Sequence, residues 1–182
     1  VLMIYSNLIK NFFWRVDSVA FGLKNIIIFG IVILFAILAN LFSIYSIKGD
    51  KLNNLEPARI LEPLFVILFA IVFSLFVQDL YERNAKIIVP ALIGGLALVF
   101  SHVQKKHLKF NKYFLEAIFG SLFYAMELVV SRLILDFYSP ITFYFLRCSS
   151  IFLLGFVFFK PKFAEIGKKA RWQIFFTGAI WV

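Results

Sequence analysis

The chain has 182 residues, of which 62% are hydrophobic and 16% are charged. A soluble domain of this size does not carry several separate apolar runs of bilayer-spanning length, so the composition predicts an all-α, polytopic helical membrane protein. The net charge of +9 does not indicate nucleic-acid binding, because the basic residues lie between the apolar runs, as juxtamembrane charges do. The single cysteine, Cys148, excludes a disulfide within the chain.

The N-terminal part predicts one helix end followed by one complete span. Residues 1–13 have the pattern of a helix whose beginning precedes the chain, so we expect the sequence to be a fragment of a longer membrane protein. Residues 14–17 mark a membrane interface, and residues 24–47 predict a spanning helix. A buried Asn in such a helix usually hydrogen-bonds a neighbouring helix. We expect that role for Asn40, with a contact to a substrate as the alternative.

Two more apolar runs follow this span. Glu56 and Pro57 predict the start of a helix that continues to about residue 78, with Pro63 inside it as the cause of a kink. Residues 87–103 predict the next span. Its small residues, which include Gly94, allow close packing against another helix.

The strongest charge cluster lies between residue 103 and the next apolar run. Basic clusters beside a helix end orient a membrane protein and contact anionic lipid, and we expect both here. The lysines of this cluster are Lys105, Lys106, Lys109 and Lys112. No metal or other cofactor is expected, because His102 and His107 have no cysteine or carboxylate near them in the sequence.

Residues 113–160 contain two apolar runs joined by a tight polar turn at residues 136–140. Glu127 and Arg147 lie inside these runs, where a charged side chain costs at least about 2.5 kcal/mol and by default suggests a function. At about 100° per residue, one face of the first run carries small and polar side chains, which predicts that this face is turned toward a bundle or cavity. The residues of this face are Glu116, Gly120, Tyr124, Glu127 and Ser131.

Each of these side chains has a functional and a structural interpretation. Glu127 could bind a proton or a cationic substrate, it could pair with Arg147 or Arg132, or it could face a water-filled cavity without a role. Arg147 could neutralise an anionic group, or it could hold the two helices of this stretch together. Tyr124 could cover a substrate ring or serve only in packing. Glu116, near the start of its helix, is expected to be a solvated acid at the membrane interface.

The same stretch resembles the opening of an EamA-type repeat of the drug/metabolite transporter superfamily. That repeat has an early Gly and a basic residue on its first helix, a Ser-Pro turn, and an Arg midway along its second helix. These places are occupied here by Gly120, Arg132, Ser139, Pro140 and Arg147. The acidic Glu127 is not part of the general family pattern, so the resemblance implies nothing about its role.

An earlier part of the chain resembles the end of such a repeat. The family has a Pro at the start of its fourth helix, a Glu-Arg pair that closes this helix, and a Gly-containing fifth helix. These features correspond to Pro63, Glu82, Arg83 and Gly94. Tyr81 stands where the family often has Gly.

The resemblance implies a fragment of a ten-helix transporter built from two inverted repeats of five helices. Residues 1–112 would be the C-terminal part of the first repeat, and residues 113–182 the N-terminal part of the second. The expected activity is export or exchange of a small polar metabolite, amino acid or drug by alternating access, in the plasma or inner membrane. The candidate substrate-binding residues are Glu127, Tyr124, Gly120, Ser131, Arg147 and Asn40.

A protein that does not transport, such as a lipid-processing enzyme or a helical scaffold, is the alternative. The sequence shows no phosphate-binding loop, nucleophile elbow or metal-ligand spacing, so we do not expect an enzyme. The orientation in the membrane stays open. The excess of basic residues would place the loop after Lys48 in the cytoplasm, whereas the family resemblance would place it outside.

Overall fold

The computed structural model describes residues 15–49, 55, 58–77, 85–103, 111–160, 167 and 172–173. These residues are almost entirely helical, and no strand occurs among them. The elements are a 3-10 turn η1 (Ser18–Phe21) and the helices α2 (Leu23–Gly49), α4 (Glu62–Phe76), α5 (Ala85–Val103), α6 (Lys112–Leu135) and α7 (Pro140–Phe159). The chain divides into two compact units, Val1–Ile151 and Phe152–Val182.

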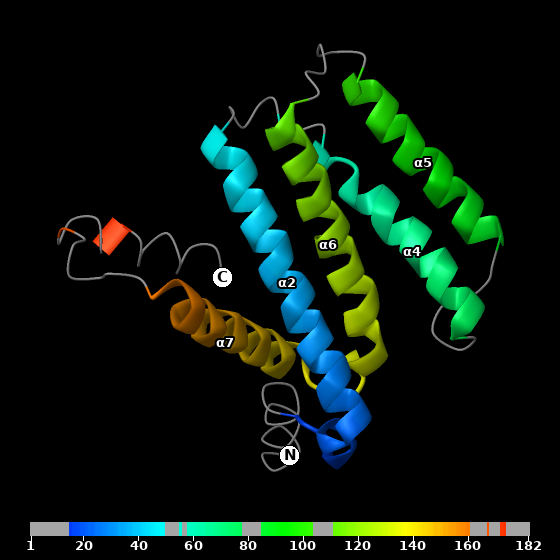
Figure 1. Cartoon of the computed structure of the whole chain (residues 1–182). Helices are drawn as coiled ribbons and strands as arrows, with labels where there is room; N and C mark the ends of the chain where they lie inside the picture. Colours follow the sequence, from blue (N-terminus) through cyan, green and yellow to red (C-terminus); the bar gives the residue numbers. More distant parts are fainter. Residues whose placement is uncertain are drawn as a thin grey trace, which may run out of the picture. The chain divides into compact units, whose positions relative to one another are not determined.

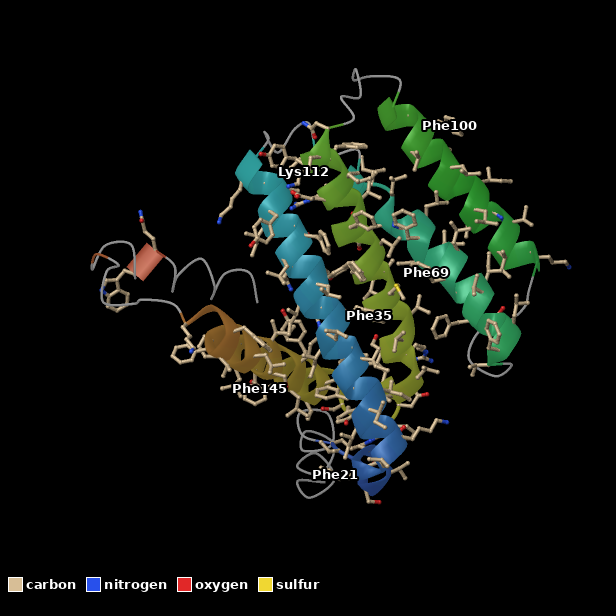
Figure 2. All side chains as sticks on the ribbon, in the orientation of Figure 1. Phe21, Phe35, Phe69, Phe100, Lys112 and Phe145 are labelled. Atoms are coloured by element: carbon tan, nitrogen blue, oxygen red, sulfur yellow. The ribbon has the colours of Figure 1, made fainter. Side chains whose placement is uncertain are left out.

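Among the described residues, three helices are long and apolar enough to cross a membrane. They are Leu23–Lys48, Lys112–Leu135 and Pro140–Phe158, and the apolar helices Glu62–Phe76 and Ile88–Ser101 are shorter. Large apolar side chains also cover the outside of the helices, as Phe21 and Phe100 do in Figure 2. Lipid tails can cover such a surface without cost, whereas water cannot. The chain is therefore a helical integral membrane protein, as the composition predicts.

The helices of the first unit lie side by side in the order α2, α6, α4, α5 (Figure 1). Helices α2 and α6 run antiparallel, whereas α4 runs in the same direction as α6 and α5 returns beside it. On the α4 side, the hydroxyl of Ser121 donates a hydrogen bond to the carbonyl oxygen of Ala58 at 3.1 Å. Helix α6 is thus the central element, with packed neighbours on two sides.

The closest approach between α2 and α6 occurs at Gly120. A Cβ atom added there would lie 2.9 Å from Oγ of Ser43, 3.3 Å from its backbone nitrogen and 3.5 Å from the carbonyl oxygen of Ala39. Aromatic rings pack along the same contact, with centroids of Phe42 and Phe123 5.6 Å apart. A glycine allows the two backbones to approach because it has no side chain, which is a common device in membrane helix packing.

The start of α4 differs from the prediction made for Pro63. The structure has a turn at residues 60–61, and α4 begins at Glu62 with Pro63 in its first turn. Proline is tolerated there because the amide groups of the first turn have no partner within the helix. The predicted kink within one continuous helix was therefore wrong.

The predicted turn at residues 136–140 is confirmed, and its sequence explains its form. Helix α6 ends at Leu135 and α7 begins at Pro140. The hydroxyl of Ser139 accepts a hydrogen bond from the backbone N–H of Thr142 at 3.2 Å, which caps the start of α7. Pro140 follows as the first helical residue, where its fixed φ favours the helix. The ring of Tyr138 packs against Phe143 beside this cap, and burial raises the pKa of the Tyr138 phenol.

A second set of contacts ties this turn to the segment before α2. We call it the turn clamp: residues 15–17 against residues 136–139, with Val16 bridged to Tyr138. The backbone N–H of Asp17 donates to the carbonyl oxygen of Phe137 at 2.9 Å, and the N–H of Ser139 donates to that of Arg15 at 2.8 Å. The clamp holds the N-terminal end of α2 and the C-terminal end of α6 at the same side of the bundle.

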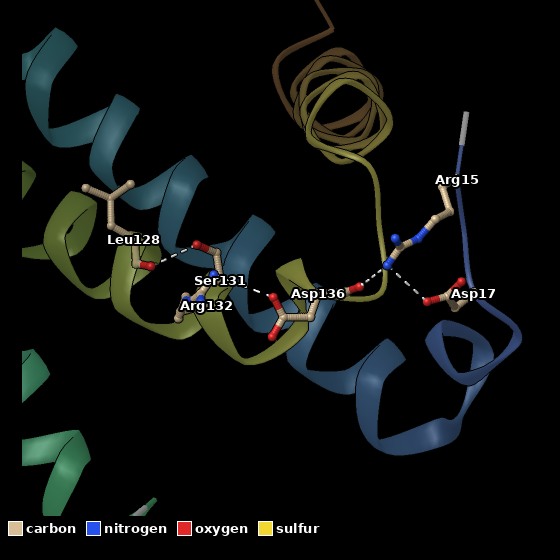
Figure 3. Close-up of polar contacts among 6 residues, drawn as sticks. All are labelled: Arg15, Asp17, Leu128, Ser131, Arg132 and Asp136. Atoms are coloured by element: carbon tan, nitrogen blue, oxygen red, sulfur yellow. Dashed lines mark hydrogen bonds and ion pairs between the residues drawn. The ribbon is translucent and has the colours of Figure 1, made fainter. Parts of the chain in front are cut away.

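Side chains reinforce the turn clamp (Figure 3). The guanidinium of Arg15 donates to the carbonyl oxygen of Asp136 at 2.6 Å and lies 3.3 Å from the carboxylate of Asp17. The carboxylate of Asp136 in turn lies 3.6 Å from Arg132, one helical turn away. Both ion pairs are largely exposed, so each contributes at most about 1 kcal/mol.

Several sequence expectations concern parts of the chain outside the described residues. They are the helix end at residues 1–13, the Glu82 and Arg83 pair, the lysines Lys105, Lys106 and Lys109, and the final run after residue 173. Of the basic cluster, Lys112 is described, and it lies exposed at the start of α6 with its ammonium 3.8 Å from Glu116.

We predict that replacing Gly120 by Leu separates α2 from α6. The new side chain would overlap Ser43 and the backbone of α2, and overpacking of this kind costs about 1–3 kcal/mol. The free energy of unfolding in detergent should fall accordingly. Gly30 is the matched control, because a Cβ atom there has no neighbour within 4 Å. If Gly30→Leu destabilised the protein as much as Gly120→Leu, the close contact at Gly120 would not be the cause.

We also predict that Arg15→Ala loosens the turn clamp. The variant loses the hydrogen bond to Asp136, worth about 1 kcal/mol. Hydrogen–deuterium exchange at the amides of Asp17 and Ser139 should become faster, because both amides donate across the clamp. Arg132→Ala, which removes only an exposed ion pair, serves as the control. Unchanged exchange at both amides in Arg15→Ala would contradict the assigned role.

Candidate functional site

The candidate site is centred on Glu127, whose side chain is buried although it carries an ionisable group. The residue is 2% exposed. Its oxygen Oε1 accepts a hydrogen bond from Nε of Arg147, so that a carboxylate of α6 and a guanidinium of α7 form an ion pair. Arg132, the other partner considered for Glu127, instead pairs with Asp136 near the end of α6. The structure therefore selects Arg147.

The pair lies deep along both helices. Glu127 is eight residues before the end of α6, and Arg147 is seven residues after the start of α7. At about 1.5 Å per residue, these positions are about 12 Å and about 10 Å from the turn that joins the helices. Both residues therefore lie well inside the apolar helices that carry them, about two turns from the joining turn.

One oxygen of the Glu127 carboxylate is left without a protein partner. Oε2 is buried and accepts no hydrogen bond from the residues that the structure describes. The guanidinium carbon of Arg147 also lies 6.0 Å from the ring centre of Tyr144, a distance typical of a cation–π contact. The site thus combines a paired charge with an acceptor that a proton or a donor group can still satisfy.

The other four residues of the predicted polar face lie along α6 on either side of Glu127. Gly120 and Ser131 are buried, and the Ser131 hydroxyl donates to the carbonyl oxygen of Leu128 in its own helix at 2.8 Å. Tyr124 is 37% exposed and lies at the edge of the face. Glu116 shares the face, is only partly buried, and leaves its Oε2 without a partner among the described residues.

Asn40 does not take the role expected for it. It is exposed, and its side-chain amide donates to the carbonyl oxygen of Ala36 at 2.8 Å, one turn earlier in α2. A polar side chain in a membrane helix can satisfy itself in this way without a neighbouring helix. The predicted interhelical hydrogen bond is therefore wrong within the described part of the chain, and Asn40 is not brought to Glu127 by any described contact.

Two contributors were not predicted from the sequence. Ser43 of α2 forms the surface that Gly120 packs against, and Tyr144 adjoins Arg147. The spacing of Tyr144 and Arg147, three residues apart on one helix, was a usable signal for the second contact. The contact of Ser43 with Gly120 depends on which helix packs against α6. The spacing of residues within α2 does not show this.

Among the described residues, no group of three or more His, Cys, Asp or Glu side chains is placed to hold a metal ion. Comparisons with protein-family models, with curated proteins and with solved structures found no match to this chain.

We predict that Arg147→Leu destabilises the protein more than the double change Glu127→Leu with Arg147→Leu does. Removing one partner of a buried pair leaves an unpaired charge, which costs about 3–5 kcal/mol, whereas removing both leaves an apolar contact. A double-mutant cycle on the free energy of unfolding in bicelles measures the difference. Additive effects of the two single changes would show that the pair is not coupled.

Proposed function

We propose that this chain is part of a membrane transporter that moves a small polar metabolite, amino acid or drug across the plasma or inner membrane by alternating access. In this proposal it performs no covalent chemistry. The chain supplies the end of the second helix through the start of the eighth in a ten-helix protein of two inverted five-helix repeats. The proposed family is the EamA-type transporters of the drug/metabolite transporter superfamily.

The observation that supports transport best is the buried ion pair of Glu127 and Arg147. Charged residues within membrane helices are rare, and they mark substrate or ion pathways more often than they serve packing alone. Here both charges lie within helices long and apolar enough to cross a membrane, and inverted-repeat transporters bind their substrates inside the membrane. In a structural scaffold, an apolar contact at this place would stabilise the protein at least as well as the ion pair does.

The residues that carry the family resemblance have physical roles consistent with the proposal. Gly120 allows the close packing of α6 on α2, and Ser139 and Pro140 form the capped turn that starts α7. In the proposal α2, α4, α5, α6 and α7 are the third to seventh helices. The antiparallel pairing of α2 with α6 agrees with this numbering, since helices three and six cross the membrane in opposite directions.

Within the proposed site, Glu127 and Arg147 bind the charged or polar groups of the substrate. Tyr124 lies beside them on α6 and would contact an apolar or ring portion. Gly120 and Ser131 shape the same face by being small. Asn40 is exposed on α2, so it contributes only if a part of the transporter beyond the described residues brings the substrate to it.

We predict that Glu127→Gln abolishes or strongly reduces uptake in proteoliposomes that contain the protein carrying this chain. A panel of radiolabelled amino acids and small polar metabolites would be tested with and without a pH gradient. Gln keeps the size of Glu but removes the charge that pairs with Arg147.

Glu116→Gln is the matched control, because Glu116 is an acid on the same face of α6 but near the helix start, and it should retain most of the flux. Equal flux in wild type and Glu127→Gln would reduce Glu127 to a structural residue. Absence of flux for every compound in the wild type would contradict transport, and it would favour a lipid-processing enzyme or a scaffold.

A further inference from the structure

The first half of α7 is attached to the rest of the unit differently from the other helices. Helices α2 and α6 pack along much of their length, whereas the part of α7 up to Ile151 contributes one buried residue, Phe143, to the apolar core that it shares with them. Among the described residues of α7, only Thr142 and Phe143 in its first turn are buried. The next polar attachment to α6 is the ion pair of Arg147 with Glu127. Helix α7 is thus held at its start and at one point midway along its length.

Helices α2 and α6, to which α7 is attached, are joined to each other at two places. The turn clamp joins the end of α6 to the start of α2, and Gly120 brings the two backbones together farther along. The start of α7 is held by the Ser139 cap, next to the clamp. A movement of α7 relative to α2 and α6 would therefore be a rotation about Ser139 and Pro140, and it would require Arg147 to leave Glu127.

The chemistry of Glu127 makes this separation dependent on a proton. The ion pair requires an ionised carboxylate, and a carboxylate left buried without its partner is costly enough that the group binds a proton instead. The unpartnered Oε2 is the atom that can take that proton without displacing an existing hydrogen bond. Proton and guanidinium therefore compete for one carboxylate.

We propose that Glu127 and Arg147 form a proton-operated latch, in which an ionised Glu127 holds the first half of α7 on α6 and a protonated Glu127 releases it. The ligand of Glu127 in this latch is a proton. The latch rests on the proposed function only for its biological purpose. In an alternating-access cycle, the latch would couple proton binding to the movement of α7.

The charged and titratable groups around Glu127 come from three helices. From α7 it faces the guanidinium of Arg147, with Tyr144 and Cys148 beside it. On α6, the phenol of Tyr124 adjoins Arg147. On α4, the carboxylate of Glu62 repels that of Glu127, and Arg59 offsets the charge of Glu62. Helix α2 has no titratable side chain between Lys24 and Tyr45. Among the described residues, Arg147 is thus the cation that pairs directly with the carboxylate.

The movement is tested by distance measurements between spin labels in the full protein, reconstituted in lipid nanodiscs and with Cys148 replaced by Ser. One label pair joins Leu34 of α2 to Phe145 of α7, and a reference pair joins Leu34 to Leu128 of α6, all three positions being exposed. We expect the α2–α7 distance distribution to be narrow at mildly alkaline pH and to shift or broaden at mildly acidic pH. The α2–α6 distribution should stay constant. With Glu127→Gln, the α2–α7 distribution should be broad at both pH values.

The proton itself is tested with dicyclohexylcarbodiimide, which reacts with protonated carboxyl groups in apolar surroundings. The acid O–H adds across one C=N bond of the reagent, with the proton going to nitrogen, and the adduct rearranges to a stable N-acylurea that mass spectrometry locates. Labelling of Glu127 should increase several-fold from alkaline to acidic pH. In Arg147→Leu it should be high at both pH values, whereas Arg147→Lys should restore the pH dependence.

The two measurements separate the latch from the proposed function. Unchanged α2–α7 distances, or labelling of Glu127 that responds neither to pH nor to Arg147→Leu, would overturn the latch even if the protein transports. A pH-dependent release of α7 in a protein that transports none of the compounds tested would support the latch and contradict the transport proposal.

Discussion

The bilayer's exclusion of an uncompensated charge is the constraint on which the rest of this structure depends. An isolated carboxylate at the depth of Glu127 would be expensive in hydrocarbon, and Arg147 makes it tolerable by supplying the opposite charge from the next helix. Because their helices are joined by a short capped turn, the two side chains can meet without any long-range adjustment of the chain. The geometry of α6 and α7 follows from this requirement.

Around that pair the protein uses contacts of two different kinds. The seam of α2 and α6 is closed by shape, with Gly120 against Ser43 and Ala39 and with stacked aromatic rings. The attachment of α7 beyond its first turn is electrostatic. Contacts of shape are insensitive to protons and ions, whereas an ion pair responds to both. The contact of α2 with α6 is therefore insensitive to pH, whereas the attachment of α7 to α6 can respond to it.

Much of the fold follows from local pattern, since the spans, the turn at residues 136–140 and the shared face of Gly120, Glu127 and Ser131 depend on period and hydropathy alone. What could not be predicted depends on tertiary choices. Whether Pro63 starts a helix or kinks one depends on where the preceding turn ends, and Asn40 could find an acceptor in its own helix. Glu127 had two candidate arginines, and only the packing of α7 decides between them.

The turn clamp has a consequence for the order in which the protein is assembled. Arg15 and Asp136 are 121 residues apart in the sequence, so their hydrogen bond cannot form until α6 has been synthesised and inserted. Until then the start of α2 lacks the partners that the turn clamp gives it. Contacts of such high sequence separation form late and slowly. The clamp is therefore a closing step of biogenesis, made when the two distant helix ends finally meet at one face of the membrane.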